Sequence, residues 1–154
     1  MRDNIKTLID AVNHEADCID ELIDAIRDQR EAMKERDTET VNSIMDDIRD
    51  IFFDAQTADT KRNDLSKRLA AEFMTEPKAS SLAEKMHDDE KAIFNGTVDR
   101  LTQSVFVLKS EMMILTGLIE QNEKYTSMLL SEFQRLSGEE GHRISRSGGA
   151  DFKG

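Results

Sequence analysis

Residues 3–35 read DNIKTLIDAVNHEADCIDELIDAIRDQREAMKE, and this stretch decides the fold of the chain. Apolar side chains recur in it at spacings of three and four, and the stripe that they form consists of Ile5, Leu8, Val12, Ile19, Leu22, Ile26 and Met33. Such spacing places all of these side chains along one side of an α-helix, with polar residues on the other side. We therefore predict one long amphipathic helix from about Asp3 to about Glu35.

A second long helix is predicted after an interruption at Arg36-Asp37-Thr38. Asp37 is a suitable N-cap, because its carboxylate can accept hydrogen bonds from the free N–H groups of the first turn. The apolar stripe of this helix consists of Val41, Ile44, Ile48, Ile51, Ala55, Ala58, Leu65 and Leu69. We expect the helix to reach about Met74, since Pro77 cannot continue it.

The third helical region is expected in two pieces. Ser81 and Glu84 have the spacing of a capping box, which predicts a helix start at Ser81. Leu82, Met86 and Ile93 then share one face, but the stripe that follows is out of phase with them; it consists of Leu101, Val105, Leu108, Met112, Leu115, Ile119, Leu129, Phe133 and Leu136. Because Asn95-Gly96 lies between the two stripes, we predict a bend or break there.

These elements predict an all-α fold. Helices joined by short connections pack antiparallel to their neighbours, and a helix of roughly 35 residues is ~50 Å long. We therefore expect an elongated antiparallel bundle or coiled coil of three long helices, the third interrupted near Asn95-Gly96. Residues 1–136 are expected to form a single helical domain, and residues 137–154, rich in Gly and Ser, are expected to be a flexible tail.

The charge of the chain disfavours several classes of function. The formal net charge is -11, which opposes binding to nucleic acids and to anionic membrane surfaces. No apolar run approaches the ~20 residues of a membrane span, and the N-terminal residues are unlike a secretion signal. The single cysteine, Cys18, cannot form an internal disulfide. Together these features predict a cytoplasmic protein without membrane insertion.

Little in the sequence points to catalysis. The sharpest signal is Glu84 with His87, since carboxylate-bridged di-metal bundles use two Glu-x-x-His motifs on helices. The second copy, Glu139 with His142, falls in the predicted tail. His14 and Cys18 lie one helical turn apart, but two ligands do not make a metal site. We therefore expect no enzyme, no metal and no cofactor, with a di-metal bundle enzyme as a remote alternative.

Three polar residues fall on the apolar stripes: Glu15 on the first, Arg62 on the second and Asn122 on the third. Each could pair or extend to solvent at the edge of a wide bundle, and we favour this interpretation for Glu15. A buried polar residue can instead fix the register of packed helices. For Asn122 the two interpretations are equally supported.

The last helix is apolar over much of its circumference. Its stripe is widened by Phe106, Val107, Met113, Ile114, Leu118, Met128 and Leu130. A helix of this kind is either central in the bundle or carries a second, binding face.

Four motifs carry a resemblance to a known family. They are Leu22-Ile23-Asp24-Ala25-Ile26 in the first helix, the break at Arg36-Asp37 before Val41, Lys61-Arg62-Asn63-Asp64-Leu65 in the second helix, and Leu118-Ile119-Glu120-Gln121-Asn122-Glu123-Lys124 in the last. In this order they resemble the FlgN family of flagellar type III export chaperones, over most of the chain before Ser137. The resemblance implies a cytoplasmic chaperone that binds the C-terminal helical segment of hook-associated proteins, prevents their premature assembly and delivers them to the flagellar export apparatus.

For the client site we propose the C-terminal half of the last helix. Its anchors would be Tyr125, Met128, Leu129, Phe133 and Leu136, because aromatic and large apolar side chains dominate interface energetics. The alternative function is a structural coiled-coil adaptor or self-assembling protein, whose apolar surface would be covered by self-association. The sequence leaves open whether the protein is a homo-oligomer.

Overall fold

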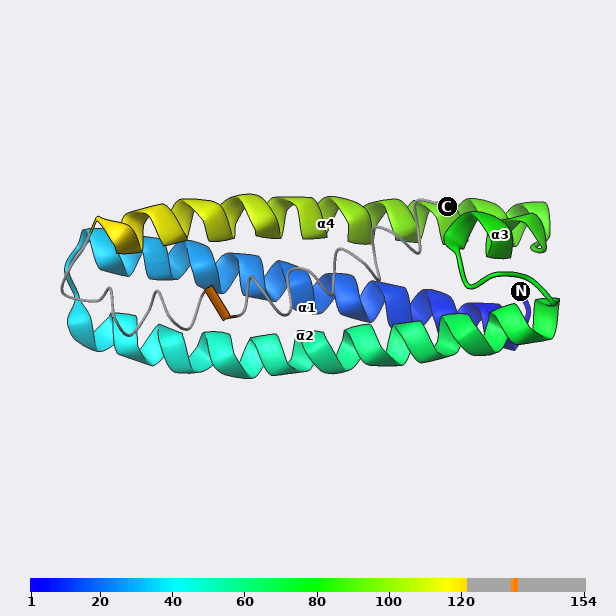
Figure 1. Cartoon of the computed structure of the whole chain (residues 1–154), viewed down its shortest axis with the longest axis horizontal. Helices are drawn as coiled ribbons and strands as arrows, with labels where there is room; N and C mark the ends of the chain where they lie inside the picture. The colour runs from blue at the N-terminus through cyan, green and yellow to red at the C-terminus, as the bar shows by residue number, and fades with distance from the viewer. Residues whose placement is uncertain (122–133, 136–154) are drawn as a thin grey trace.

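The computed structural model describes residues 1–121 and 134–135, and its elements are helices throughout (Figure 1). In chain order they are α1 (Asp3–Lys34), α2 (Thr38–Phe73), α3 (Ala79–Glu84) and α4 (Asp88–Glu120). No strand occurs in these described residues. The predicted all-α bundle with three long helices is therefore confirmed, and the first two helices begin and end within a residue or so of the predicted positions.

The first helix is the central one. Figure 1 shows α1 lying lengthwise between α2 and α4, antiparallel to α2 and parallel to α4. It packs along both neighbours, whereas α2 and α4 form no comparable contact with each other. Buried side chains follow α1 from end to end; the apolar ones are Ile5, Leu8, Ile9, Ala11, Val12, Ala16, Cys18, Ile19, Leu22, Ile23, Ile26, Ala32 and Met33.

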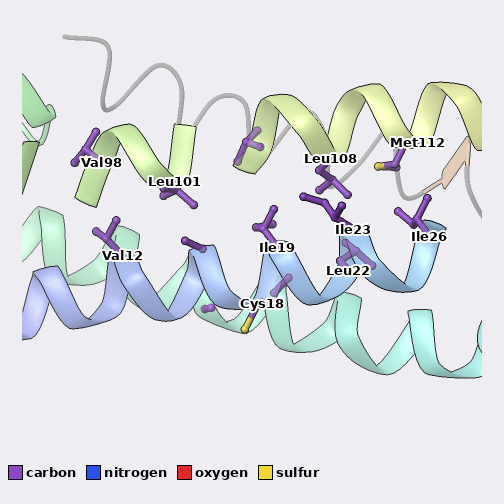
Figure 2. Close-up of a cluster of buried hydrophobic side chains, with 14 of the residues drawn as sticks. Val12, Cys18, Ile19, Leu22, Ile23, Ile26, Val98, Leu101, Leu108 and Met112 are labelled. Atoms are coloured by element: carbon purple, nitrogen blue, oxygen red, sulfur yellow. The ribbon is translucent and has the colours of Figure 1, made fainter. Parts of the chain in front are cut away.

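The interface between α1 and α4 is a continuous apolar seam. Figure 2 shows Val12, Ile19 and Ile26 of α1 opposite Val98, Leu101, Leu108 and Met112 of α4. Ion pairs at the solvent edge hold the two helices in register: Arg100 contacts Asp17 and Asp20 at 2.6 and 3.0 Å. Glu111 of α4 is held in turn by Arg30 of α1 at 2.8 Å.

The predicted cap of α2 is present. The carboxylate of Asp37 accepts hydrogen bonds from the hydroxyl group of Thr40 at 2.6 Å and from the backbone N–H of Thr40 at 3.1 Å, and these contacts lower the pKa of Asp37. Arg36 before it and Met74 after α2 both adopt left-handed backbone conformations, with φ of 57° and 55°. At each position the following N–H bonds back into the last turn, so both long helices end in Schellman-type turns.

The predicted interruption of the third helical region lies elsewhere. The chain breaks at residues 85–87, and α4 runs without a break through Asn95 and Gly96. The reason is the phase of the apolar stripe: the buried residue is Phe94, whereas Ile93 is 50% exposed. Phe94 is in phase with Val98 and Leu101, so the stripe needs no restart.

The helix start predicted at Ser81 is also wrong. α3 begins at Ala79, so Ser81 lies inside the helix and does not cap it. At the N-terminus of α4, the carboxylate of Glu90 accepts a hydrogen bond from the backbone N–H of His87 at 2.9 Å. Thr97 lies inside α4, where its hydroxyl group donates to the carbonyl oxygen of Ile93.

Candidate functional site

An apolar surface is exposed on α4. Phe106 is 69% exposed, Met113 is 75% exposed and Ile114 is 48% exposed. Phe106 and Met113 are seven residues apart and therefore lie two turns apart on one side of the helix. We call these three residues the α4 apolar face.

The opposite side of α4 packs against the bundle. Leu108, Met112 and Leu115 are buried there, and Val107 and Leu118 are partly buried against the same core. Because α1 occupies the centre of the bundle, a central position does not explain the excess of apolar residues on α4. An exposed apolar helix face with Phe and Met side chains is typical of a surface that receives an amphipathic helix.

The proposed client anchors Tyr125, Met128, Leu129, Phe133 and Leu136 lie outside the described residues. Asn122 lies outside them as well, so both of its interpretations, as a register residue and as a residue at the bundle edge, stay predictions. The α4 apolar face precedes these residues in the sequence and is the part of the wide apolar helix that the structure describes.

The two other polar stripe residues meet in the core. Arg62 and Glu15 are each 0% exposed, and Nε of Arg62 donates to Oε1 of Glu15. The Nη2 group of Arg62 also donates to Oδ1 of Asp59, one turn earlier on α2, at 2.6 Å. The expectation that Glu15 lies at the bundle edge is therefore wrong, because its partner Arg62 reaches it across the α1–α2 interface.

This buried cluster carries two carboxyl groups and one guanidinium group. Burial raises the pKa of Glu15 to about 7; Arg62 opposes the rise, and the nearby Asp59 carboxylate adds to it. One positive charge cannot neutralise two buried carboxylates, so the site favours the protonated form of Glu15 more than water does. The sequence patterns singled out both residues but did not show that they pair with each other, since Glu15 and Arg62 are 47 positions apart.

Gln29 is a further buried polar residue that the sequence reasoning missed. Its side chain is 0% exposed, and Nε2 donates to the backbone oxygen of Val41 at 3.0 Å. The bond ties the end of α1 to the first turn of α2. Its position between Ile26 and Met33 of the first stripe is the signal that could have identified it.

The candidate metal ligands that the structure describes are not assembled into a site, and Glu139 and His142 lie outside the described residues. Glu84 ends α3, whereas His87 precedes α4, so the Glu-x-x-His motif is split between two elements. His14 and Cys18 are adjacent, with Nε2 and Sγ 3.7 Å apart. Within residues 1–121 and 134–135, no group of three or more His, Cys, Asp or Glu side chains is arranged to hold a metal ion. None of the helices described in this chain is both long and apolar enough to cross a membrane.

Comparison with known proteins gives a family match. The sequence model of the FlgN protein family matches residues 1–143. No curated protein and no solved structure matches the sequence. The family match covers all four described helices, including α1 at the centre of the bundle and α4 with its apolar face. The chain therefore belongs to the FlgN family of flagellar export chaperones.

Proposed function

We propose that this protein binds the C-terminal helical segment of hook-associated proteins in the cytoplasm, keeps these clients unassembled, and delivers them to the flagellar export apparatus. Family membership supports an export chaperone in general. The observation that supports helix binding in particular is the α4 apolar face, where Phe106 and Met113 are more than two-thirds exposed.

The physical argument concerns the client before assembly. A segment that packs as an amphipathic helix in a polymer exposes its apolar side while it is a monomer, and this side promotes aggregation or premature assembly. The α4 apolar face would cover the apolar side of the client helix reversibly. The thioether of Met113 and the ring of Phe106 give such a surface large contact area and tolerance of different partner side chains.

The proposed site also includes residues that follow α4 in the sequence. Its anchors are Tyr125, Met128, Leu129, Phe133 and Leu136, together with the α4 apolar face. Tyr125 is the only tyrosine of the chain, and its ring can bury apolar area while its hydroxyl group remains hydrogen-bonded.

A matched pair of phenylalanine substitutions tests the site. Phe106 on α4 and Phe53 on α2 have nearly equal exposure, 69% and 67%. In titrations with a purified hook-associated protein, Phe106→Ala and Phe133→Ala should weaken binding by about tenfold or more, whereas Phe53→Ala should not change it. Equal weakening by Phe53→Ala and Phe106→Ala would contradict this placement of the client site.

The oligomeric state separates this proposal from a self-assembling coiled-coil protein. If the α4 apolar face were covered by a second copy, Phe106→Ala would convert an oligomer into a monomer in sedimentation experiments. We expect the wild type and Phe106→Ala to sediment alike in the absence of a client.

A further inference from the structure

A second surface lies on the other side of α1. Between α1 and α2 the structure has an open groove of about 420 Å³, and its apolar floor consists of Ala25, Ile44 and Ile51. All three floor side chains are partly buried and packed against the core, so one side of each still faces the groove. The groove is distinct from the α4 apolar face, because none of its lining residues belongs to α4.

The walls of the groove are acidic on both sides. Its remaining lining residues are Glu21, Asp24 and Asp28 on α1 and Asp47, Asp50 and Asp54 on α2. On each helix they recur at three and four residues over two turns, so each wall is a row of carboxylates ~10 Å long. No Lys or Arg of the described residues lines the groove.

The carboxylates of the groove differ from those on the opposite edge of α1. On the α4 side, Asp17 and Asp20 are paired with Arg100, and Glu111 is paired with Arg27 and Arg30. In the described part of the chain, no salt bridge or hydrogen bond joins a side chain of the groove walls to a cation. Among the described residues, arginine side chains thus pair with the acidic residues at the α1–α4 edge, whereas the six acidic side chains of the α1–α2 groove have no such partner.

The field of these carboxylates extends into the bundle. The pKa of the buried Cys18 thiol is raised, first by burial and then by the negative charges of Asp54 and Glu21. Like charges on the two walls of one groove repel each other, and a partner with the opposite charge would relieve the repulsion.

We propose that the α1–α2 groove docks a basic amphipathic helical segment of another protein. The shape favours a helix, because a groove between two packed helices is the surface on which a further helix of a bundle lies. The charge favours a basic one: Lys or Arg side chains on its flanks would contact the carboxylate walls, while an apolar stripe would cover Ala25, Ile44 and Ile51. Because none of its lining residues belongs to α4, the groove would be available while a client occupies the α4 apolar face.

The test uses the full chain and a defined probe. The probe is a fluorescent amphipathic peptide of about 20 residues made of Leu, Ala and Lys, with a matched peptide that carries Glu in place of Lys. By fluorescence anisotropy, the Lys peptide should bind with an affinity that falls as salt rises, and the Glu peptide should not bind. Failure of the Lys peptide to bind would overturn the proposal.

Two sets of variants with equal charge separate the groove from the overall acidity of the protein. The first is Asp47→Asn, Asp50→Asn and Asp54→Asn combined, and we expect it to weaken binding by about tenfold. The control combines Asp10→Asn, Asp64→Asn and Asp99→Asn, which changes exposed carboxylates outside the groove and should have little effect. Equal weakening by the two sets would show attraction to net charge alone and would overturn the proposal.

A further pair of variants tests the apolar floor and the independence of the two surfaces. Ile51→Ser should weaken binding of the Lys peptide severalfold if a helix is docked, with its fold checked by circular dichroism; Ile44→Ser serves if Ile51→Ser unfolds. An unchanged affinity in a folded floor variant would overturn helix docking in favour of ionic attraction. Phe106→Ala should leave this affinity unchanged, so failure of the client site and failure of the groove are distinguishable.

Discussion

Arg62 of α2 donates a hydrogen bond from Nε to Oε1 of Glu15 of α1, and neither side chain is exposed to solvent. The same guanidinium group binds Asp59 at 2.6 Å. This contact joins the two helices near the middle of their shared interface. Because a misaligned pairing of α1 and α2 would leave these charges buried without partners, the cluster favours one register of the antiparallel pair.

Removal of Arg62 should be strongly destabilising. Arg62→Met keeps much of the side-chain volume but leaves the buried carboxyl groups without a cation, and we expect a loss of about 3–5 kcal/mol in the free energy of unfolding. Urea denaturation followed by circular dichroism measures the change. A loss no larger than that of an exposed substitution such as Arg49→Met would contradict the structural role of the cluster.

The cluster also predicts a dependence of stability on pH. The pKa of Glu15 is about 7 in the folded protein, whereas a glutamate in an unfolded chain titrates near its ordinary value of about 4.3. Between these two values the folded state holds a proton that the unfolded state has released. The contribution of Glu15 to stability is therefore present at low pH and is lost as the pH rises through about 7.

Glu15→Gln isolates this effect, because glutamine does not titrate. The difference in unfolding free energy between Glu15→Gln and the wild type should shift in favour of the variant from pH 5 to pH 8, by up to about 3 kcal/mol. Glu90 does not interfere in this range: its hydrogen bonds with Arg2 hold its pKa far below the ordinary value, so its contribution is lost only in acid. A difference that does not change between pH 5 and pH 8 would show that Glu15 is ionised throughout.

Gly96→Ala should stabilise the protein. Gly96 lies inside α4, and a Cβ atom at this position meets no atom within 4 Å apart from the adjacent residues and the surrounding backbone of its own helix. Alanine avoids the entropic cost of glycine in a helix, so we expect a gain of about 0.5–1 kcal/mol and a higher melting temperature. A loss of stability would indicate that a bend at Asn95-Gly96 is needed after all.

Two substitutions on α4 should separate its buried side from its exposed side. Leu115 is 0% exposed, and Leu115→Ala should cost about 2–5 kcal/mol through lost burial and a residual cavity. Phe106→Ala, on the exposed side, should change stability by less than about 0.5 kcal/mol. Thermal and urea unfolding of the two variants provide the comparison, and comparable losses would mean that the α4 apolar face is covered in the isolated chain.

Much of the fold could be predicted because the signals are periodic. The stripe from Ile5 to Met33 predicted α1. Asp37 predicted the start of α2, because an N-cap depends only on residues that are close in sequence. The prediction at Asn95-Gly96 was wrong because Ile93 and Phe94 are both apolar. Choosing between them requires the position of the partner helix, which no local pattern contains.

The sequence by itself determined the all-α class, the extent of the two first helices, and the presence of an apolar surplus on the last one, because these depend on periodicity and capping along the chain. Only the tertiary structure decided that α1 is central, that Glu15 meets Arg62 in the core, and that acidic rows from α1 and α2 face each other across an apolar floor. These relationships join residues that are far apart in sequence. They arise when helices pack with a particular register and rotation, and those are set by the sum of many contacts rather than by any one motif.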